Sequence, residues 1–527
     1  MRRARRAEGL AAAALALAAA WVPARAGAGT PDAAALYARH CAGCHGADRL
    51  GGMGPALVPG ALGRLTRERA ARVIRDGRPL TQMPAFGGRL GEAEIAALAA
   101  FVFTPPARPP RWDLAAVRRT HRMLARAADL PERPVHRADP MNLFVVVELG
   151  DHHVTVLDGD RFERVARFPT HRALHGGPKF SPDGRFVYFA SRDGWISKYD
   201  LWGLRYVAEV RAGINTRNIA VSHDGRFVAV ANYLPQTLVI LSAADLAPIR
   251  LIEVRDAAGE RPSRVSAVYT APPRGSFVAA LKDVPEMWEI PYLPGAPPVY
   301  RGPMHDWRAD SGEPPAVAEG PFPVRRIPLD AVLDDFFFDP GYRFVVGAAR
   351  GGGARVISLV TGAEVRRLPI EGLPHLGSGI SWMRGGGRVL ATPNLRRGAI
   401  SVIDMERWEV VAEIPTLGPG FFLRSHARSP YLWADVFFGP HRDAMHVIDK
   451  RTLRIVRTLR PAPGKTSAHV EFTRDGRYAL VSVWDMDGAI VVYDARTLEE
   501  VRRIPMRKPS GKYNVWNKTH YEEGTSH

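Results

Sequence analysis

Two cysteines and a histidine near the start of the chain have the spacing that attaches haem covalently. Cys41, Cys44 and His45 form a Cys-x-x-Cys-His motif, which contains both cysteines of the chain. Two thiols at this spacing can add to the two vinyl groups of one porphyrin, and the adjacent imidazole can then ligate the iron. A zinc or redox-active cysteine pair is the alternative, but it would need further ligands or a βαβ context. The motif therefore predicts a covalent haem c and an electron carrier.

A methionine further along the chain is the predicted second axial ligand of this iron. Gly54 and Pro55, and then Met83 and Pro84, follow the motif where small c-type cytochromes turn the chain and return a thioether to the iron. Met53 is the weaker candidate, and a buried methionine can also be core filler. We predict that Met83 is the ligand.

The composition is that of a large, basic globular protein. The chain has 527 residues with 50 glycines, 44 prolines and 46% hydrophobic residues, so it exceeds one ordinary domain. Its formal net charge is +18, and the arginines are scattered through strand and turn segments rather than clustered. The charge therefore indicates attraction to acidic partners and anionic ligands, such as a propionate-bearing macrocycle, rather than binding of nucleic acid.

The first 26 residues have the pattern of a secretory signal peptide. Basic Met1–Arg6 precedes the apolar run Leu10–Val22, and Ala24–Ala26 offers small residues for cleavage. The run is too short to span a bilayer, and no later stretch is long enough. We expect an exported, periplasmic protein without a stable membrane span, which suits a haem that is attached outside the bacterial cytoplasm.

Two further segments precede a long strand-rich region. In residues 27–103 apolar residues recur at helical spacing, with a last amphipathic helix at Glu92–Val102, and this predicts a small all-α cytochrome c domain. Residues 104–139 are a linker, in which the prolines of Thr104–Pro110 stop the helix and stiffen the chain. One more helix is predicted at Trp112–Leu130.

Residues 140–527 repeat one tight turn that leads into an apolar strand. Eight units at roughly 40 to 50 residue spacing are typical of propeller blades, so we predict an all-β eight-bladed propeller. Seven blades are the alternative, because a proline-rich insertion at about 290–335 could hide or mimic a repeat. Clear turns, degenerate turns and strand pairs mark the units: Ser181–Phe186, Ser222–Phe227, Thr473–Tyr478, Asp339–Phe344, Arg384–Val389, Ala427–Tyr431, Leu143–Leu157 and Val265–Trp288.

Two histidines interrupt the repeat among glycines. His175 precedes Gly176 and Gly177, and His375 is followed by Gly377. Glycines let a flat ligand approach the backbone, and a histidine beside them is a candidate for iron ligation or proton transfer. A histidine that is simply bonded into its loop is the alternative, and a propeller by itself does not specify a function.

The domain order and several stretches resemble cytochrome cd1 nitrite reductase and its relatives, whose propeller holds haem d1. The resemblance covers essentially the whole chain and implies a haem d1-binding propeller. The stretches that carry it are Arg192–Trp195, Asp200–Trp202, Pro374–Gly377, Val483–Trp484 and Pro509–Val515.

One departure from the nitrite reductases argues against nitrite reduction. Their pocket uses two distal histidines, the first in a His-Asp-Gly-Gly segment, and the corresponding stretch here is Val332–Phe338, which has no histidine. His375 matches the second. Asp334 and Asp335 lie at the changed place, and Asp334 is a candidate catalytic group. Because two carboxylates would repel an anionic macrocycle, we expect at least one of them to point to solvent or to an arginine.

The chain more closely resembles the dihydro-haem d1 dehydrogenases and their haem d1-assembly paralogues. The attached cytochrome domain favours the dehydrogenases, because the paralogue usually lacks one. This resemblance implies the last step of haem d1 synthesis, in which a propionate loses two hydrogens and becomes an acrylate. The stretches that carry it are Ala212–Asn218, Leu281–Glu286, Gly418–Phe422, Arg424–His426 and Asp435–Pro440.

The implied reaction needs a base, carboxylate clamps and an exit for two electrons. His375 is the predicted base, with His426 as the alternative. Arg192 and Arg217 are the predicted clamps, and His175 is the predicted axial ligand of the d1 iron.

Haem c accepts one electron at a time, so the iron of the substrate is the predicted temporary store. An external acceptor then reoxidises haem c. The predicted protein partners are cytochrome cd1 nitrite reductase and the haem d1 assembly proteins. A haem d1 carrier without catalysis and a nitrite reductase with altered proton donors are the alternative functions.

Overall fold

The computed structural model of the protein describes most of the chain beyond its first 30 residues. The described residues are 31–62, 65–78, 83–107, 110–296, 299, 317–318 and 320–520. The predicted signal peptide, residues 1–26, lies outside them. Within the described part of the chain, no helix is long and apolar enough to cross a membrane.

The N-terminal region is a bundle of short helices around a small core. Asp32 caps α1 by accepting hydrogen bonds from the first backbone N–H groups, and Thr66 caps α4 in the same way. Buried Tyr37, Ile95 and Leu98 pack together at the centre. The predicted last helix is present as α5. The helices are α1 (Ala33–His40), α2 (Ala42–His45), α3 (Pro59–Leu62), α4 (Arg67–Asp76) and α5 (Glu92–Val102).

The linker contains a shorter helix than the sequence predicted. Helix α6 (Leu114–Thr120) ends before His121, so the predicted helix Trp112–Leu130 is wrong beyond Thr120. The chain leaves the helix there because β1 (Arg122–Met123) joins the outer strand β8 as a fifth strand. The 3₁₀ turn η1 (Ala127–Asp129) follows.

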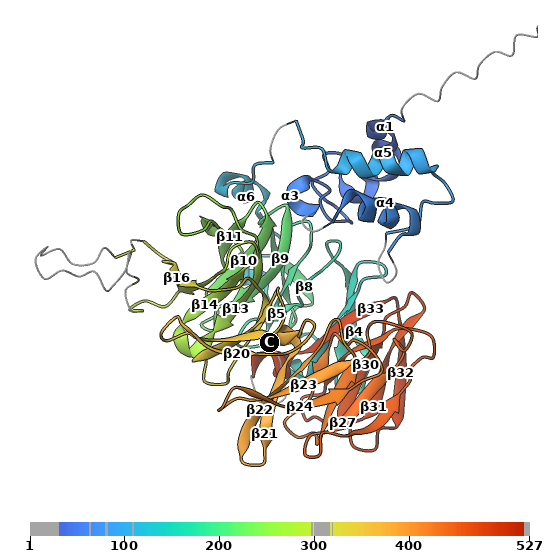
Figure 1. Cartoon of the computed structure of the whole chain (residues 1–527), viewed down its shortest axis with the longest axis vertical. Helices are drawn as coiled ribbons and strands as arrows, with labels where there is room; N and C mark the ends of the chain where they lie inside the picture. The colour runs from blue at the N-terminus through green and yellow to red at the C-terminus, as the bar shows by residue number, and fades with distance from the viewer. Residues whose placement is uncertain are drawn as a thin grey trace, which may run out of the picture.

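Eight antiparallel sheets form the rest of the described chain (Figure 1). Their shared faces bury most of its apolar side chains. The eight-bladed prediction is therefore confirmed. The strands of the eight sheets, each sheet from its inner to its outer strand, are β33 (Pro509–Asn514), β2 (Leu143–Glu148), β3 (His153–Asp158), β4 (Arg164–Pro169); β5 (Lys179–Phe180), β6 (Phe186–Ala190), β7 (Trp195–Asp200), β8 (Arg205–Arg211); β9 (Asn215–Val221), β10 (Phe227–Leu234), β11 (Thr237–Ser242), β12 (Pro248–Glu253); β13 (Val265–Ala271), β14 (Ser276–Leu281), β15 (Glu286–Pro291), β16 (Arg325–Pro328); β17 (Leu333–Phe338), β18 (Phe344–Ala349), β19 (Ala354–Ser358), β20 (Glu364–Leu368); β21 (Ile380–Arg384), β22 (Gly387–Pro393), β23 (Ala399–Asp404), β24 (Glu409–Pro415); β25 (Leu423–Arg424), β26 (Tyr431–Asp435), β27 (Met445–Asp449), β28 (Ile455–Leu459); β29 (Ser467–Phe472), β30 (Tyr478–Val483), β31 (Gly488–Asp494), β32 (Glu500–Met506).

The repeated turns join the inner strand of a sheet to the second strand. In three of them the glycine after aspartate has a φ near +72°, namely 73° at Gly184, 71° at Gly225 and 73° at Gly476. Only glycine adopts this conformation readily, which explains the Asp-Gly signature. Short 3₁₀ turns and one helix complete the fold: η2 (Pro140–Asn142), η3 (Pro272–Arg274), η4 (Leu376–Ser378) and α7 (Val515–Thr519).

The ring is closed by the C-terminal strand. β33 pairs with β2, so the first sheet combines the last strand of the chain with the first three of the propeller (Figure 1). The proline-rich insertion lies between β15 and β16, which pair with each other. It therefore interrupts one blade without adding or removing one, and the seven-bladed alternative is wrong.

Candidate functional site

The haem motif is held on α1 and α2 with its histidine ready to ligate iron. The His45 Nδ1 atom donates a hydrogen bond to the carbonyl oxygen of Pro55 at 2.8 Å, which leaves Nε2 for a metal. Burial lowers the pKa of His45, so the imidazole is neutral, as ligation requires. A Cβ atom at Gly54 would lie 2.4 Å from the His45 ring, so only glycine fits there.

The two candidate methionine ligands lie in different surroundings. Met83 packs against the helical core cluster that also includes Cys41 and Ala42. Met53 belongs to the loop next to Gly54, which touches the His45 ring. Met83 thus shares a core with Cys41, and its role as the second iron ligand stays a prediction.

A cavity of about 250 Å³ opens within the propeller, among the connections that lead from one blade to the next. Its wall combines glycine-rich backbone, aromatic rings and cationic side chains. The lining includes His175, Gly176, Gly177, Lys179, Arg217, Tyr269, Asp335, His375, Phe421, Phe422, Arg424, His469, Trp484, Tyr513 and Lys518.

His175 sits in the connection between β4 and β5, between two arginines. Its Nδ1 atom donates to the carbonyl oxygen of Arg217 at 2.9 Å, and its Nε2 atom lies 2.7 Å from Arg192 Nη2. Burial and the two guanidinium groups hold the pKa of His175 well below its usual value. The imidazole is therefore neutral, and a metal could replace Arg192 at Nε2.

His375 is oriented through the same ring nitrogen as His175. Its Nδ1 atom donates to the carbonyl oxygen of Phe421 at 2.7 Å, and the two rings are 4.3 Å apart. Its Nε2 atom lies 3.8 Å from Asp335 Oδ2. Burial lowers the pKa of His375, while the Asp335 carboxylate raises it. A neutral imidazole with a carboxylate nearby is suited to accept a proton.

The cavity holds more buried positive charge than negative charge. Lys179, Arg217, Arg424 and Lys518 line it, and Asp335 is the lining carboxylate. Desolvation, with repulsion from Arg424, lowers the pKa of Lys179 to about 8 and that of Lys518 to about 7. Cations that repel one another in a desolvated site favour an anionic ligand.

One of these cations has donors that no described residue satisfies. Arg424 is 6% exposed, and its Nε and Nη1 atoms have no hydrogen-bond partner in the described structure. The indole Nε1 of Trp484 is in the same situation. Buried donors normally have partners, so these groups fit the carboxylates of a tetrapyrrole such as haem d1 or its dihydro precursor.

Sequence reasoning missed a second pair of polar side chains in the cavity. The rings of His469 and Tyr513 lie 5.1 Å apart, and His469 Nδ1 has no partner among the described residues. The pKa of Tyr513 is raised to about 12 by burial, so its hydroxyl is protonated. His469 has a φ of 52° at a bulge in β29, a local geometry that the sequence does not signal. Tyr513 lies in Pro509–Val515, a segment that carries the family resemblance but in which the sequence predicted no site residue.

Three predicted site residues are absent from the cavity lining: Arg192, His426 and Asp334. Arg192 bonds instead to His175 Nε2. His426 lies in the turn between β25 and β26, where its ring contacts Phe472 and where a Cβ atom at Gly476 would meet it. This turn lies at the end of the strands away from the cavity connections, so His426 is not placed to act as a base.

Asp334 bonds to Lys282 at 3.1 Å and to Arg350 at 3.4 Å, outside the cavity lining. The expectation that one carboxylate of the pair meets an arginine fits this arrangement, but the catalytic role given to Asp334 does not. Its neighbour Asp335 is the carboxylate that lines the cavity, where it accepts a hydrogen bond from the Tyr269 hydroxyl at 2.9 Å.

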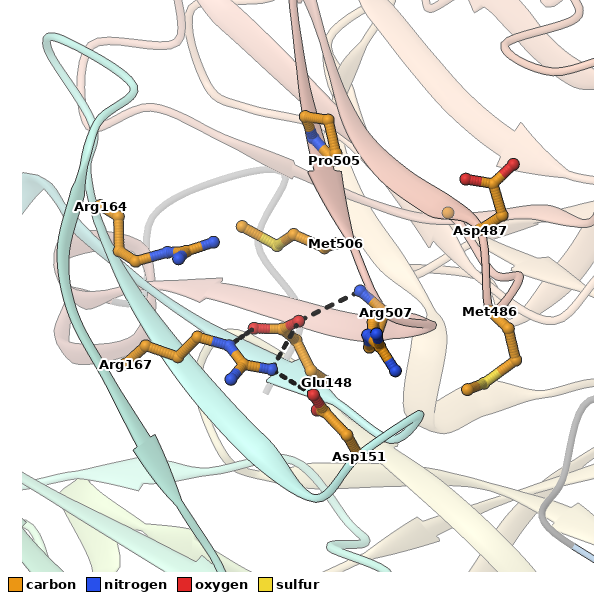
Figure 2. A pocket seen from close by; sticks show the side chains of 10 residues that line it. Glu148, Asp151, Arg164, Arg167, Met486, Asp487, Pro505, Met506 and Arg507 are labelled. Carbon is orange, nitrogen blue, oxygen red and sulfur yellow. Dashed lines mark hydrogen bonds and ion pairs between the residues drawn. The ribbon is translucent and has the colours of Figure 1, made fainter.

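A larger hollow of about 800 Å³, the rim groove, lies between the first and last sheets (Figure 2). Figure 2 shows Arg167 pointing at Glu148 and Asp151, with Arg507 beside them. Arg167 Nε bonds to Glu148 at 3.0 Å, and the Arg507 backbone N–H donates to the same carboxylate at 3.1 Å. The groove's buried carboxylate is thus satisfied from both sheets, and the rim groove serves as a seam between blades.

Comparisons with known proteins find matches for two parts of the chain. The family model described as "Cytochrome D1 heme domain" matches residues 138–302 and 317–518, and that of "Cytochrome C oxidase, cbb3-type, subunit III" matches residues 28–102.

Similar proteins include two curated relatives and one solved structure. The dihydro-heme d1 dehydrogenase of Pseudomonas aeruginosa is 57% identical over 95% of this chain and 97% of its own length. Protein NirF of the same bacterium is 30% identical over 70% of this chain and 90% of its own length. The structure of the dihydro-heme d1 dehydrogenase NirN in complex with DHE matches with a TM-score of 0.81 and 56% identity, over 92% of this chain and 99% of that one.

Proposed function

The chain belongs to the cytochrome D1 heme domain family, and we propose that it is an oxidoreductase that converts dihydro-haem d1 to haem d1. The observation that carries the proposal is a cavity in which excess buried cations surround two neutral imidazoles, His175 and His375. The cations suit the carboxylates of a tetrapyrrole, one imidazole suits its iron, and the other suits a proton on its side chain.

The cavity residues divide the work of binding. His175 is the proposed axial ligand, since Arg217 fixes its ring through Nδ1 and leaves Nε2 for the iron. Arg192 and Arg217 are the proposed carboxylate clamps, joined by Arg424, whose donors lack protein partners. Arg192 must leave His175 Nε2 to do this, and it then becomes free to bind a carboxylate.

His375 is the proposed base. Converting a propionate to an acrylate breaks two C–H bonds and releases two protons and two electrons. His375 takes the first proton at Nε2, where the Asp335 carboxylate 3.8 Å away favours the imidazolium, and it releases that proton to solvent before it accepts the second. Tyr513, protonated at neutral pH, is suited to donate a hydrogen bond to the reacting side chain.

The electrons leave through the cytochrome domain. Haem c, attached at Cys41 and Cys44 and ligated by His45 and Met83, supplies a one-electron acceptor, so the two electrons depart in successive steps. A one-electron carrier outside this chain then reoxidises it. We also propose that the protein works in the periplasm and hands haem d1 to cytochrome cd1 nitrite reductase, with haem d1 assembly proteins as further partners.

Anaerobic mixing of the purified protein with dihydro-haem d1 tests the function. We expect the macrocycle spectrum to convert to that of haem d1 while haem c becomes reduced. Binding without conversion would instead make the protein a carrier of haem d1. A Cys41→Ser, Cys44→Ser variant, which lacks haem c, is the matched control and should bind the macrocycle without converting it.

Steady turnover of nitrite with a chemical electron donor would instead support a nitrite reductase. The stretch Val332–Phe338 has no histidine to protonate nitrite, so we expect no such turnover.

A further inference from the structure

One arginine side chain connects the cytochrome domain to the propeller. Arg211 ends β8, and its Nη2 atom donates to the carbonyl oxygen of Leu50, at 3.3 Å, in the loop that follows the haem motif. Its Nε atom donates to the carbonyl oxygen of Asp193 at 2.7 Å, within the propeller. Its guanidinium carbon lies 4.8 Å from the centre of the Trp112 ring, in the linker. Arg211 therefore contacts three parts of the chain at once.

A small apolar contact lies beside this arginine. Ala56 and Val58 of the cytochrome loop pack against Ile214 and Leu234 of the propeller, and all four side chains are buried. Figure 1 shows the helical domain over this part of the ring, with α3 above β9 and β10. The contact is small, so the hydrogen bonds of Arg211 must fix the orientation that apolar packing alone leaves free.

The contact lies close to both proposed haem ligands along the chain. On the cytochrome side, Leu50 and Ala56 flank the turn whose Pro55 carbonyl orients His45. On the propeller side, the segment that begins at Arg211 reaches Arg217, whose carbonyl orients His175.

A second chain of contacts links Arg211 to His175 on the propeller side. Asp193 adjoins Arg192, whose guanidinium bonds to the other ring nitrogen of His175. One ring nitrogen of His175 therefore contacts Arg192, next to the Asp193 that Arg211 bonds, and the other contacts Arg217, six residues after Arg211.

The chemistry of this position calls for arginine. A planar guanidinium can stack on an indole while donating to two carbonyl groups, which a lysine ammonium cannot do. Burial lowers the pKa of Arg211, while the carboxylates of Asp193 and Asp48 raise it. Asp48 belongs to the cytochrome domain, so charge attraction also acts across the contact.

We propose that Arg211 is the positioning residue that holds the haem c domain over the segment Arg211–Arg217, and that this contact is the route of the electrons. The inference rests on the proposed function. In each step the bound macrocycle loses one electron, ferric haem c gains it and becomes ferrous, and a one-electron carrier protein reoxidises haem c. Arg211 takes no part in the bond breaking.

An Arg211→Met variant tests this role, because methionine keeps an apolar stem and removes the hydrogen bonds that the side chain makes to Leu50 and Asp193. Arg205→Met is the matched control, because Arg205 is an exposed arginine at the other end of the same strand. In the variant, reduction of haem c by dihydro-haem d1 in a stopped-flow mixing should be slower than in the parent, because electron transfer weakens steeply as the two redox centres move apart. The control should match the parent.

Three further measurements separate positioning from a general defect. Titration with the macrocycle should give an unchanged dissociation constant, and the midpoint potential of haem c should not move. Small-angle scattering should show a larger radius of gyration in Arg211→Met alone. If Arg211→Met does not fold, Ala56→Glu, which inserts a charge into the same contact from the cytochrome side, should give the same pattern.

Two outcomes would overturn the inference, and a third concerns the proposed function. Equal rates of haem c reduction in the parent and in Arg211→Met would remove Arg211 from the electron route. An unchanged radius of gyration in the slowed variant would show that Arg211 does not hold the domains together. A parent protein whose haem c is not reduced by dihydro-haem d1 contradicts the proposed function itself.

Discussion

The central cavity and the rim groove both gather charged side chains, but the buried charge in each is paired to a different degree. In the groove, buried Glu148 receives bonds from Arg167 and from the Arg507 backbone N–H, and Asp151 also pairs with Arg167. In the cavity, Arg424 keeps two buried donors without a described partner. The groove is the larger hollow, yet its buried carboxylate is already paired within the protein.

This difference separates charges that hold the fold from charges that hold a ligand. A carboxylate paired within the protein stabilises the folded state, and removing it leaves an uncompensated cation. A cation that waits for a ligand costs folding free energy and is retained for binding. We therefore expect substitutions in the cavity to change binding or chemistry, and substitutions in the groove to change stability.

The largest effect should come from the proposed base in the cavity. His375→Gln removes the proton acceptor but keeps a side chain of similar length, so conversion of dihydro-haem d1 should slow by about 10² to 10⁴ with binding retained. The measurement is single-turnover conversion followed by the macrocycle spectrum.

The matched control for that experiment is another histidine. His426→Gln changes a buried imidazole outside the cavity and should leave conversion unaffected. If His375→Gln converts the substrate at the parent rate, the base must be sought at His469 or Tyr513.

In the rim groove we expect the largest loss of stability. Glu148→Ala removes the acceptor shared by Arg167, Thr155 and the Arg507 backbone, which should cost about 3 kcal/mol of unfolding free energy. Urea denaturation followed by tryptophan fluorescence measures this loss. Macrocycle affinity should stay at the parent value, and a clear fall in affinity would contradict the division between the two hollows.

The reverse pattern is expected for Arg424 in the cavity. Arg424→Met removes a buried cation whose Nε and Nη1 atoms have no described partner, so binding of the macrocycle should weaken about 30-fold, or about 2 kcal/mol, while stability is unchanged or higher. Arg167→Met in the groove is the matched arginine control, with lower stability and parent-like affinity. Weaker folding of Arg424→Met would mean that its guanidinium is structural.

The cavity lysines predict opposite effects of pH on binding and on folding. Lys179 and Lys518 have pKa values of about 8 and about 7, below those of lysines in an unfolded chain. Ligand carboxylates raise these pKa values, so binding takes up protons, and affinity should fall up to about tenfold per pH unit for each lysine between pH 7 and 9. The unfolded chain binds more protons over this range, so unfolding free energy of the ligand-free protein should rise.

Calorimetric titration and thermal melting at pH 7, 8 and 9 check both signs. A Lys179→Met, Lys518→Met variant should lose most of the dependence of affinity on pH. An affinity that does not change with pH in the parent would mean that these lysines do not meet the ligand.

How much the sequence could predict depends on whether a feature is local. The haem c motif Cys41–His45 is contiguous, so five residues are enough to predict it. The Asp-Gly turns predict the blades because their positive φ values require glycine. The cavity is assembled from connections of several blades. The neighbouring glycines singled out His175 and His375 as candidates, and resemblance supplied their roles. Nothing local marks His469, whose position comes from a bulge in β29, or Arg424, whose significance is the absence of a partner.

The smallest effect should come from the Asp334 and Asp335 pair, which sequence alone did not tell apart. Asp335 lies 3.8 Å from His375 Nε2 and raises the pKa of that imidazole, whereas Asp334 is bonded to Lys282 and Arg350 outside the cavity. Asp335→Asn removes the charge but keeps an acceptor for the Tyr269 hydroxyl, so the pKa of His375 should fall further. A base with a lower pKa stays unprotonated to lower pH, and it is also a weaker proton acceptor. The acid limb of the rate profile should therefore move to lower pH, while the plateau rate falls by less than about tenfold.

Asp334→Asn should leave both the limb and the plateau where they are. If instead Asp334→Asn shifts the acid limb and Asp335→Asn does not, the carboxylate that sets the pKa of the base is Asp334. The role given to Asp335 beside His375 is then wrong.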